Sequence, residues 1–146
     1  MAQAVTSRPV RTAVQAAAVL VAIVFVAVGV LGFVPGVTTN FDDLLVAGHH
    51  SQALLLGVFA VSVLHNIVHL IFGVAGLLLA RTPGGARGFL IGGGVVYLAL
   101  WVYGLVVDKD SPLNFVPLNT ADDWLHLGLG LGMIALGALL APKAVR

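Results

Sequence analysis

Four long apolar segments, separated by shorter polar stretches, dominate the sequence. They run from about residue 13 to 34, 52 to 80, 88 to 107 and 121 to 141. A helix needs about 20 apolar residues to cross the hydrocarbon core of a bilayer. The pattern therefore predicts an all-α fold, a four-helix transmembrane bundle in which residues 1–146 form a single membrane domain.

The second apolar segment contains the most unusual polar residues. His65, Asn66 and His69 lie near its middle, and ionisable residues inside a membrane span are rare and usually functional. At a helical step of about 100° per residue, one sector collects Ser62, His65, Asn66, His69, Gly73, Gly76 and Ala80. The opposite side carries only Leu, Val, Ile, Ala and Phe. We expect the first face to pack on protein and the second to face lipid.

A second group of polar residues opens the fourth segment. Asn119, Asp122, Asp123 and His126 share one face of a helix. Asn119 or Thr120 suits the N-cap position, and acidic residues in the first turn favour the positive end of the helix dipole. Capping is therefore the simplest interpretation of Asp122 and Asp123.

The two groups are expected at the same depth in the membrane. At about 1.5 Å per residue, His65 and His126 each lie about 5–6 Å below the outer boundary. We therefore predict one polar cluster in the outer half of the bilayer, with Asn119 at its rim. Its members are His65, Asn66, His69, Asn119, Asp122, Asp123 and His126.

Part of this cluster has the residue types of a metal site. His65 and His69 are four residues apart on one helix, a spacing that can place two imidazoles on one metal ion. His126 and Asp122 would complete the set, and His65 with His126 could instead be the axial ligands of haem. The same spacing also suits hydrogen bonds between helices, so the sequence requires neither a metal ion nor haem.

Composition supports a membrane protein. The chain is 60% hydrophobic and 9% charged, whereas a soluble domain carries about 25% charged residues. With no cysteine, it has no disulfide, no Cys-ligated zinc, no iron–sulfur cluster and no thiol chemistry. The net charge of +1 gives no indication of a nucleic-acid partner.

The placement of charge predicts a topology. Six basic residues fall on one side of four spans: Arg8, Arg11, Arg81, Arg87, Lys143 and Arg146. All six acids fall on the other side with Lys109: Asp42, Asp43, Asp108, Asp110, Asp122 and Asp123. By the positive-inside rule both termini are cytoplasmic, and the location is the cell membrane.

Several motifs together resemble a known family. They are Gly32-Phe33-Val34-Pro35-Gly36, His65-Asn66-Ile67-Val68-His69, the stretch from Tyr97 to Gly104, Asn114-Phe115-Val116-Pro117, and Asn119-Thr120-Ala121-Asp122-Asp123-Trp124-Leu125-His126. They resemble small bacterial four-helix membrane proteins classed as a domain of unknown function, over roughly residues 29 to 137. The resemblance implies a fold and a membrane location, but no activity, substrate or cofactor. It also favours Asp122 over the more variable Asp123 as a functional carboxylate.

Three classes of function fit these residues. We favour a non-catalytic or accessory membrane protein whose polar cluster holds helices together. The first alternative is a metal- or haem-binding protein that uses His65, His69 and His126, and the second is an oligomeric transporter or proton-linked channel. No activated nucleophile or catalytic carboxylate pair is apparent, so an enzyme is not expected. The expected partner is the lipid bilayer, and a homo-oligomer or a larger membrane complex is left open.

Overall fold

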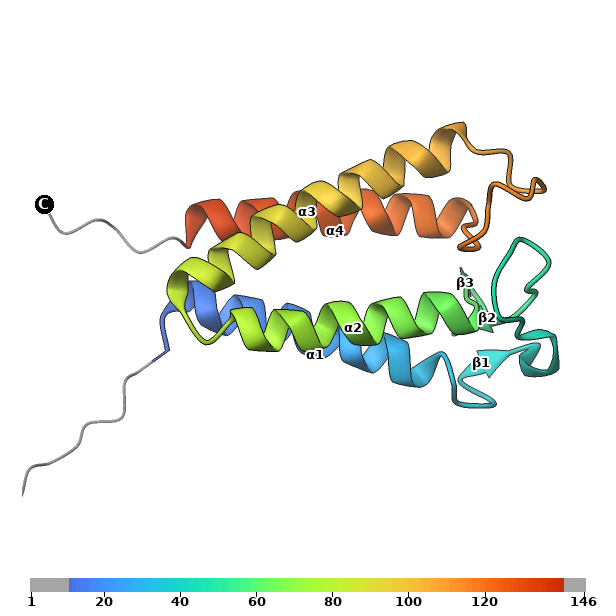
Figure 1. Ribbon diagram of the computed structural model, residues 1–146, viewed down its shortest axis with the longest axis horizontal. Helices are drawn as coiled ribbons and strands as arrows, with labels where there is room; N and C mark the ends of the chain where they lie inside the picture. Colours follow the sequence, from blue (N-terminus) through green and yellow to red (C-terminus); the bar gives the residue numbers. More distant parts are fainter. Residues whose placement is uncertain (1–10, 141–146) are drawn as a thin grey trace, which may run out of the picture.

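The computed structural model describes residues 11–140, which fold into four α-helices and one small β-sheet (Figure 1). The helices are α1 (Ala13–Leu31), α2 (Val63–Leu79), α3 (Pro83–Val106) and α4 (Thr120–Leu139). They alternate in direction, so that α1 begins, α2 meets α3 and α4 ends at the same end of the bundle. The sheet and the loop between α3 and α4 lie at the opposite end. The expected four helices are thus present.

The two ends of the bundle carry opposite charge. Arg11, Arg81 and Arg87 lie where α1 begins and α2 meets α3, which we call the basic end. The six aspartates and Lys109 lie toward the sheet, which we call the acidic end. Arg8, Lys143, Arg146 and both chain termini, which the sequence also places at the basic end, lie outside the described residues.

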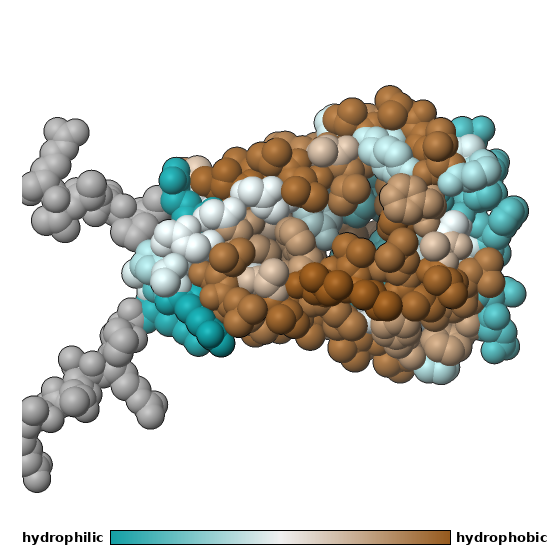
Figure 2. Space-filling model, viewed as in Figure 1, coloured by the Kyte–Doolittle hydropathy of each residue, from teal (hydrophilic) through white to brown (hydrophobic). Residues whose placement is uncertain are grey.

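The surface between the two ends is apolar. Figure 2 shows hydrophobic residues over the middle of the molecule and hydrophilic residues at both ends. Exposed aliphatic side chains occur on all four helices, among them Leu20, Ile71, Val95 and Leu131. Two helices, α1 and α3, are long and apolar enough to cross a membrane, and α2 is apolar but shorter, with 17 residues.

The helices pack as two pairs, α1 with α2 and α3 with α4, and the contacts between the pairs are fewer. Within each pair, glycines bring the backbones together. A Cβ atom built on Gly73 of α2 would lie 2.8 Å from the backbone nitrogen of Val26 in α1. One built on Gly94 of α3 would lie 2.8 Å from the carbonyl oxygen of Gly130 in α4. Small residues therefore allow close helix packing at these positions.

The two pairs meet most closely toward the basic end. There Ala86, Phe89 and Leu90 of α3 belong to the same buried apolar core as Val14 and Ala18 of α1. Toward the acidic end the pairs diverge (Figure 1). The side chains that fill this widening space form the candidate site described below.

A small antiparallel sheet caps the acidic end, and two of its three strands lie where the sequence predicted helix. The strands β1 (Thr38–Thr39), β2 (Leu54–Leu55) and β3 (Phe59–Ala60) lie in the order β1-β2-β3. Thr38 is opposite Leu55, and Leu54 is opposite Ala60. A short 3₁₀ turn, η1 (Phe41–Asp43), follows β1. The expected span of 52 to 80 is therefore wrong for its first eleven residues, because 52 to 62 precede the start of α2 at Val63.

The local sequence explains why the helix starts late. Leu56 and Gly57 join β2 to β3 with φ angles of 56° and 71°, a backbone conformation that interrupts a right-handed helix. The Ser62 hydroxyl then accepts a hydrogen bond from the His65 N–H at 3.1 Å and acts as the N-cap of α2. Hydrophobicity alone does not distinguish a buried strand from a buried helix. The apolar run from residue 52 therefore gave no indication that α2 begins only at Val63.

Two other helix starts follow their capping residues. α3 begins at Pro83 rather than near residue 88, because Thr82 accepts from the Gly85 N–H and proline suits the first helical turn. α4 begins after Asn119, one of the two expected N-caps. The expected polar face of α2 is confirmed, since the buried residues of this helix are His65, Asn66, His69, Gly73 and Gly76.

Candidate functional site

Five rings fill the space between the two helix pairs. Phe25 comes from α1, His65 and His69 from α2, Tyr97 from α3 and His126 from α4. The His65 and His69 rings stack with centroids 4.7 Å apart, and His69 meets Phe25 edge-on at 5.6 Å. Phe25 stacks on Tyr97 at 5.3 Å, and Tyr97 meets His126 edge-on at 5.2 Å. This chain of contacts connects all four helices.

The three imidazoles are buried without satisfying their hydrogen-bonding capacity. His65, His69 and His126 are only 5%, 8% and 4% exposed. We call them the three-histidine cluster. The Nδ1 atom of each has no hydrogen-bond partner in the described part of the chain. Most buried polar atoms are paired, so three unpaired nitrogens in one place make this cluster the candidate site.

Two apolar cavities flank the three-histidine cluster. The larger, of about 210 Å³, lies between α1, α2, α4 and the β2–β3 hairpin. The smaller, of about 120 Å³, lies between α2, α3, α4 and the loop before α4. All three imidazoles line both cavities. The other lining residues are aliphatic or aromatic, except Asp122 in the larger cavity.

Asp122 and Asn119 form a cap rather than a partner for the imidazoles. The Asn119 side chain accepts from the Asp122 N–H, and the Asp122 carboxylate accepts from the Asn119 N–H at 2.9 Å. The same carboxylate oxygen accepts from the Ala60 N–H of β3 at 3.1 Å, and the Asn119 amide donates to the Val58 carbonyl. The expected capping role is thus present, and it also fastens α4 to the hairpin. Among residues 11–140, no imidazole donates a hydrogen bond to the Asp122 carboxylate, which accepts from the Ala60 and Asn119 N–H groups.

Asp123 points away from the cavities, toward α3. Its carboxylate pairs with Lys109 at 2.8 Å, and Lys109 also donates to the Gly104 carbonyl at 2.7 Å. Asp123 is 4% exposed, so the pair is largely removed from water. The sequence grouped Asp123 with the histidines, but the structure assigns it to the contact between α4 and the end of α3.

Asn66 is also separate from the three-histidine cluster. Its side chain packs so closely against Gly32 at the end of α1 that a Cβ atom there would collide with the Asn66 Oδ1. Asn66 is fully buried and lines neither of the cavities beside the imidazoles. The seven expected members therefore divide into the three histidines, the Asn119–Asp122 cap, the Asp123 ion pair and the Asn66 contact.

The metal and haem alternatives find little support in this geometry. Among residues 11–140, no three His, Asp or Glu side chains gather as a metal ion requires. His65, His69, His126 and Asp122 line the same cavity without converging on one point. A haem macrocycle has four pyrrole rings around its iron and is larger than either cavity, of about 210 or 120 Å³. Neither cavity therefore offers the slot that haem between His65 and His126 needs.

A comparison with known protein families identifies the family of this chain. Residues 15–139 match the family model described as Domain of unknown function (DUF4383). The chain belongs to the DUF4383 family. The range includes the three-histidine cluster and all of the four helices except the first two residues of α1. No curated protein and no solved structure matches the chain. The resemblance seen in the sequence is confirmed, and the family carries no assigned activity.

In this DUF4383 protein, two residues at or near the site were not predicted from the sequence, although the sequence pattern sets each of them apart. Phe25 falls at helical spacing with the buried Ala18, Ala22 and Gly29 of α1. Lys109 is the lone basic residue among the acids of the acidic end, which is the mark of an ion pair. Neither pattern predicts which residue is contacted, because Tyr97, the partner of Phe25, and Asp123, the partner of Lys109, lie on other elements.

Proposed function

We propose that this chain is an integral membrane protein with four spans that binds a small lipophilic molecule carrying hydrogen-bonding oxygen atoms. It acts as a binding or accessory protein rather than an enzyme. One observation carries the proposal: three imidazoles, each more than nine-tenths buried, have unpaired Nδ1 atoms beside two apolar cavities.

The chemistry of the cavities favours an amphipathic ligand. A buried polar atom without a partner costs on the order of 1–3 kcal/mol, so an occupant that meets these nitrogens stabilises the fold. Water satisfies the nitrogens but gains nothing from the apolar walls. A planar ring with carbonyl oxygens accepts from imidazole N–H groups, and it packs beside Phe25 in the larger cavity or beside Tyr97 in the smaller one. A quinone ring is the ligand class that we favour, with any long tail left outside the cavity.

Surface and charge support the membrane assignment. α1 and α3 are long and apolar enough to span, and α2 and α4 run beside them with exposed side chains such as Ile71 and Leu131. α2 is about 25 Å long at 1.5 Å per residue, and the apolar β2–β3 hairpin extends it toward the acidic end. Because basic residues favour the cytoplasmic side, the basic end is assigned to the cytoplasm of the cell.

Single cysteines test the topology, since the chain has none of its own. Gly84→Cys lies at the basic end and Asp110→Cys at the acidic end, and both positions are exposed. In intact cells, we expect a membrane-impermeant thiol reagent to label Asp110→Cys, and to label Gly84→Cys only after permeabilisation. Labelling of Gly84→Cys but not Asp110→Cys from outside contradicts the assignment.

A matched pair of ligands tests the binding function. We expect menadione to raise the melting temperature of the protein purified in uncharged detergent. Methylnaphthalene has the same fused ring without the carbonyl oxygens, so its effect should be much smaller. His65→Phe and His126→Phe each keep a ring but lose the nitrogens, and each should weaken menadione binding about tenfold, as expected for one lost hydrogen bond.

The control for these variants is His50→Phe, the same change at an exposed loop position. It should leave menadione affinity unchanged. Equal stabilisation by menadione and methylnaphthalene, or wild-type affinity in both cluster variants, means that the histidines do not recognise the ligand.

A further inference from the structure

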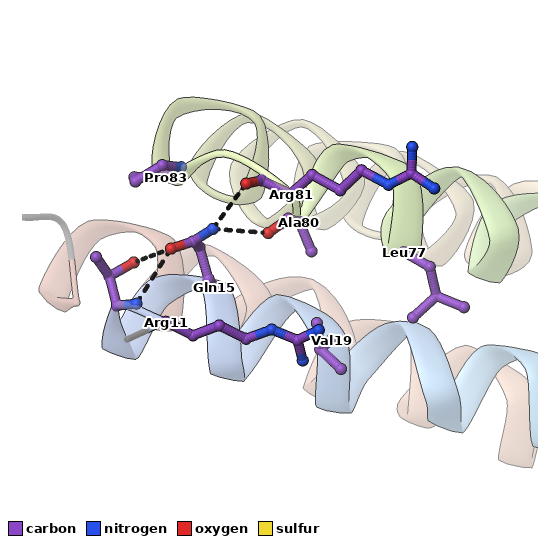
Figure 3. Close-up of a pocket in the computed structure, with 8 residues that line it drawn as sticks. Arg11, Gln15, Val19, Leu77, Ala80, Arg81 and Pro83 are labelled. Carbon is purple, nitrogen blue, oxygen red and sulfur yellow. Dashed lines mark hydrogen bonds between the residues drawn. The ribbon is translucent and has the colours of Figure 1, made fainter. Parts of the chain in front are cut away.

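A second pocket lies at the basic end, far from the three-histidine cluster. It has a volume of about 540 Å³ and lies between the start of α1 and the turn that joins α2 to α3. Figure 3 shows Arg11 and Arg81 on its two sides, with their side chains extended along α1 and α2 toward Val19 and Leu77. This pocket is within the usual size range of ligand sites, about 300–1,000 Å³.

Gln15 lines this pocket and joins the two helices on either side of it. Its amide nitrogen donates to the carbonyl oxygens of Ala80 and Arg81, both at 3.0 Å, and its oxygen accepts from the Thr12 N–H at 3.1 Å (Figure 3). These bonds fasten the start of α1 to the end of α2. They also cover two carbonyl groups at the C-terminal end of α2, where the helix dipole is negative and would repel an anion.

The two arginines have no acidic side chain near them. All six aspartates of the chain lie toward the acidic end, and the sequence contains no glutamate. Both guanidinium groups belong to exposed residues. Within residues 11–140 the ion pair found is the one between Lys109 and Asp123, at the other end of the molecule. Arg11 and Arg81 are therefore available to an external anion.

The chemistry around the arginines is that of a lipid headgroup site. A guanidinium binds phosphate through two parallel hydrogen bonds, and both Arg11 and Arg81 line the pocket. Val19 and Leu77 line the side of the pocket toward the middle of the bundle, which is apolar on the surface. An occupant with one anionic end and one apolar end matches both parts of this pocket.

We infer that the pocket between Arg11 and Arg81 binds the phosphate headgroup of an anionic lipid, with the start of an acyl chain against Val19 and Leu77. The inference relies on the proposed membrane position of the basic end, but not on any ligand of the three-histidine cluster. Inorganic phosphate shares the headgroup chemistry but lacks the chain, so the two sources are separable.

The test compares lipids bound to the full-length protein in uncharged detergent. Native mass spectrometry measures retention of phosphatidylglycerol and of phosphatidylcholine with the same acyl chains, and thermal unfolding measures stabilisation. We expect the wild type to prefer phosphatidylglycerol by about tenfold. The double variant Arg11→Gln/Arg81→Gln should lose this preference, and Arg11→Lys/Arg81→Lys, which keeps the charge but not the paired donors, should recover part of it.

Arg87→Gln is the matched control, because Arg87 is exposed at the same end but does not line the pocket. It should keep the preference for phosphatidylglycerol. Menadione binding to the double glutamine variant should equal that of the wild type, which separates this site from the three-histidine cluster. An unchanged lipid preference in the double glutamine variant overturns the inference, as does equal binding of the two lipids to the wild type. Stabilisation by millimolar inorganic phosphate equal to that by phosphatidylglycerol overturns the lipid assignment.

Discussion

Replacing Lys109 with methionine is expected to lower the free energy of unfolding by about 2 kcal/mol. Lys109→Met leaves the Asp123 carboxylate, which is 4% exposed, without its cation at 2.8 Å. Breaking a fully buried pair costs about 3–5 kcal/mol. The Lys109 side chain is 31% exposed, so solvent already weakens the pair and the expected loss is smaller.

Unfolding in mixed detergent and dodecyl sulfate micelles, followed by circular dichroism, measures this loss. The double variant Lys109→Met/Asp123→Asn removes both charges and should be more stable than Lys109→Met alone. Asp110→Asn, at an exposed residue of the same loop, should change the free energy of unfolding by less than about 0.5 kcal/mol. A Lys109→Met variant as stable as the wild type would falsify the assignment of Asp123 to this ion pair.

Gly94→Ala and Gly92→Ala are expected to change stability in opposite directions, although both glycines lie on α3. The Cβ atom at position 94 would lie 2.8 Å from the Gly130 carbonyl oxygen and 2.7 Å from the Ile134 side chain. Overpacking of this kind costs about 1–3 kcal/mol because α3 and α4 must separate. At position 92 nothing lies within 4 Å, so alanine gains up to about 1 kcal/mol from its higher helix propensity.

The same unfolding measurement distinguishes the two variants. Gly130 lies on the α4 side of the same contact, and its Cβ atom would lie 3.0 Å from the Gly94 carbonyl oxygen. Gly130→Ala should therefore lower stability as Gly94→Ala does. Gly132→Ala, with nothing within 4 Å, should resemble Gly92→Ala. Equal effects at positions 92 and 94 would show that α3 does not contact α4 through Gly94.

The glycines illustrate what a sequence pattern leaves undecided. Small residues favour close packing of helices, and by residue type alone six glycines of α3 and α4 are equal candidates for it: Gly92, Gly93, Gly94, Gly128, Gly130 and Gly132. Gly92, Gly128 and Gly132 have nothing within 4 Å, whereas Gly93, Gly94 and Gly130 meet other side chains or backbone. Residues one or two positions apart point about 100° or 200° apart around a helix. Only the position of the neighbouring helix decides which of them meets it.

Features that depend on local geometry were determined by the sequence itself. The buried face of α2 follows from helical periodicity, and the start of α4 follows from the hydrogen-bonding capacity of Asn119. The opposite charge of the two ends follows from the order of basic and acidic loops along the chain. Each involves residues within one element or simple alternation between elements, so no knowledge of the packing is needed.

Features that depend on distant partners were decided only by the tertiary structure. Asp122 meets the Ala60 N–H, 62 residues away, and Gln15 meets the Ala80 carbonyl, 65 residues away. Before Val63 the chain forms a β-hairpin instead of the predicted helix. This hairpin places the Ala60 N–H beside the Asp122 carboxylate, so the long-range hydrogen bond depends on the hairpin. The three-histidine cluster was predictable as a set of residues, because His65 and His126 are expected at one depth and His69 shares the helix face of His65 one turn deeper. Its unpaired nitrogens and the cavities beside them exist because the two helix pairs diverge, and that divergence is a property of the packed bundle.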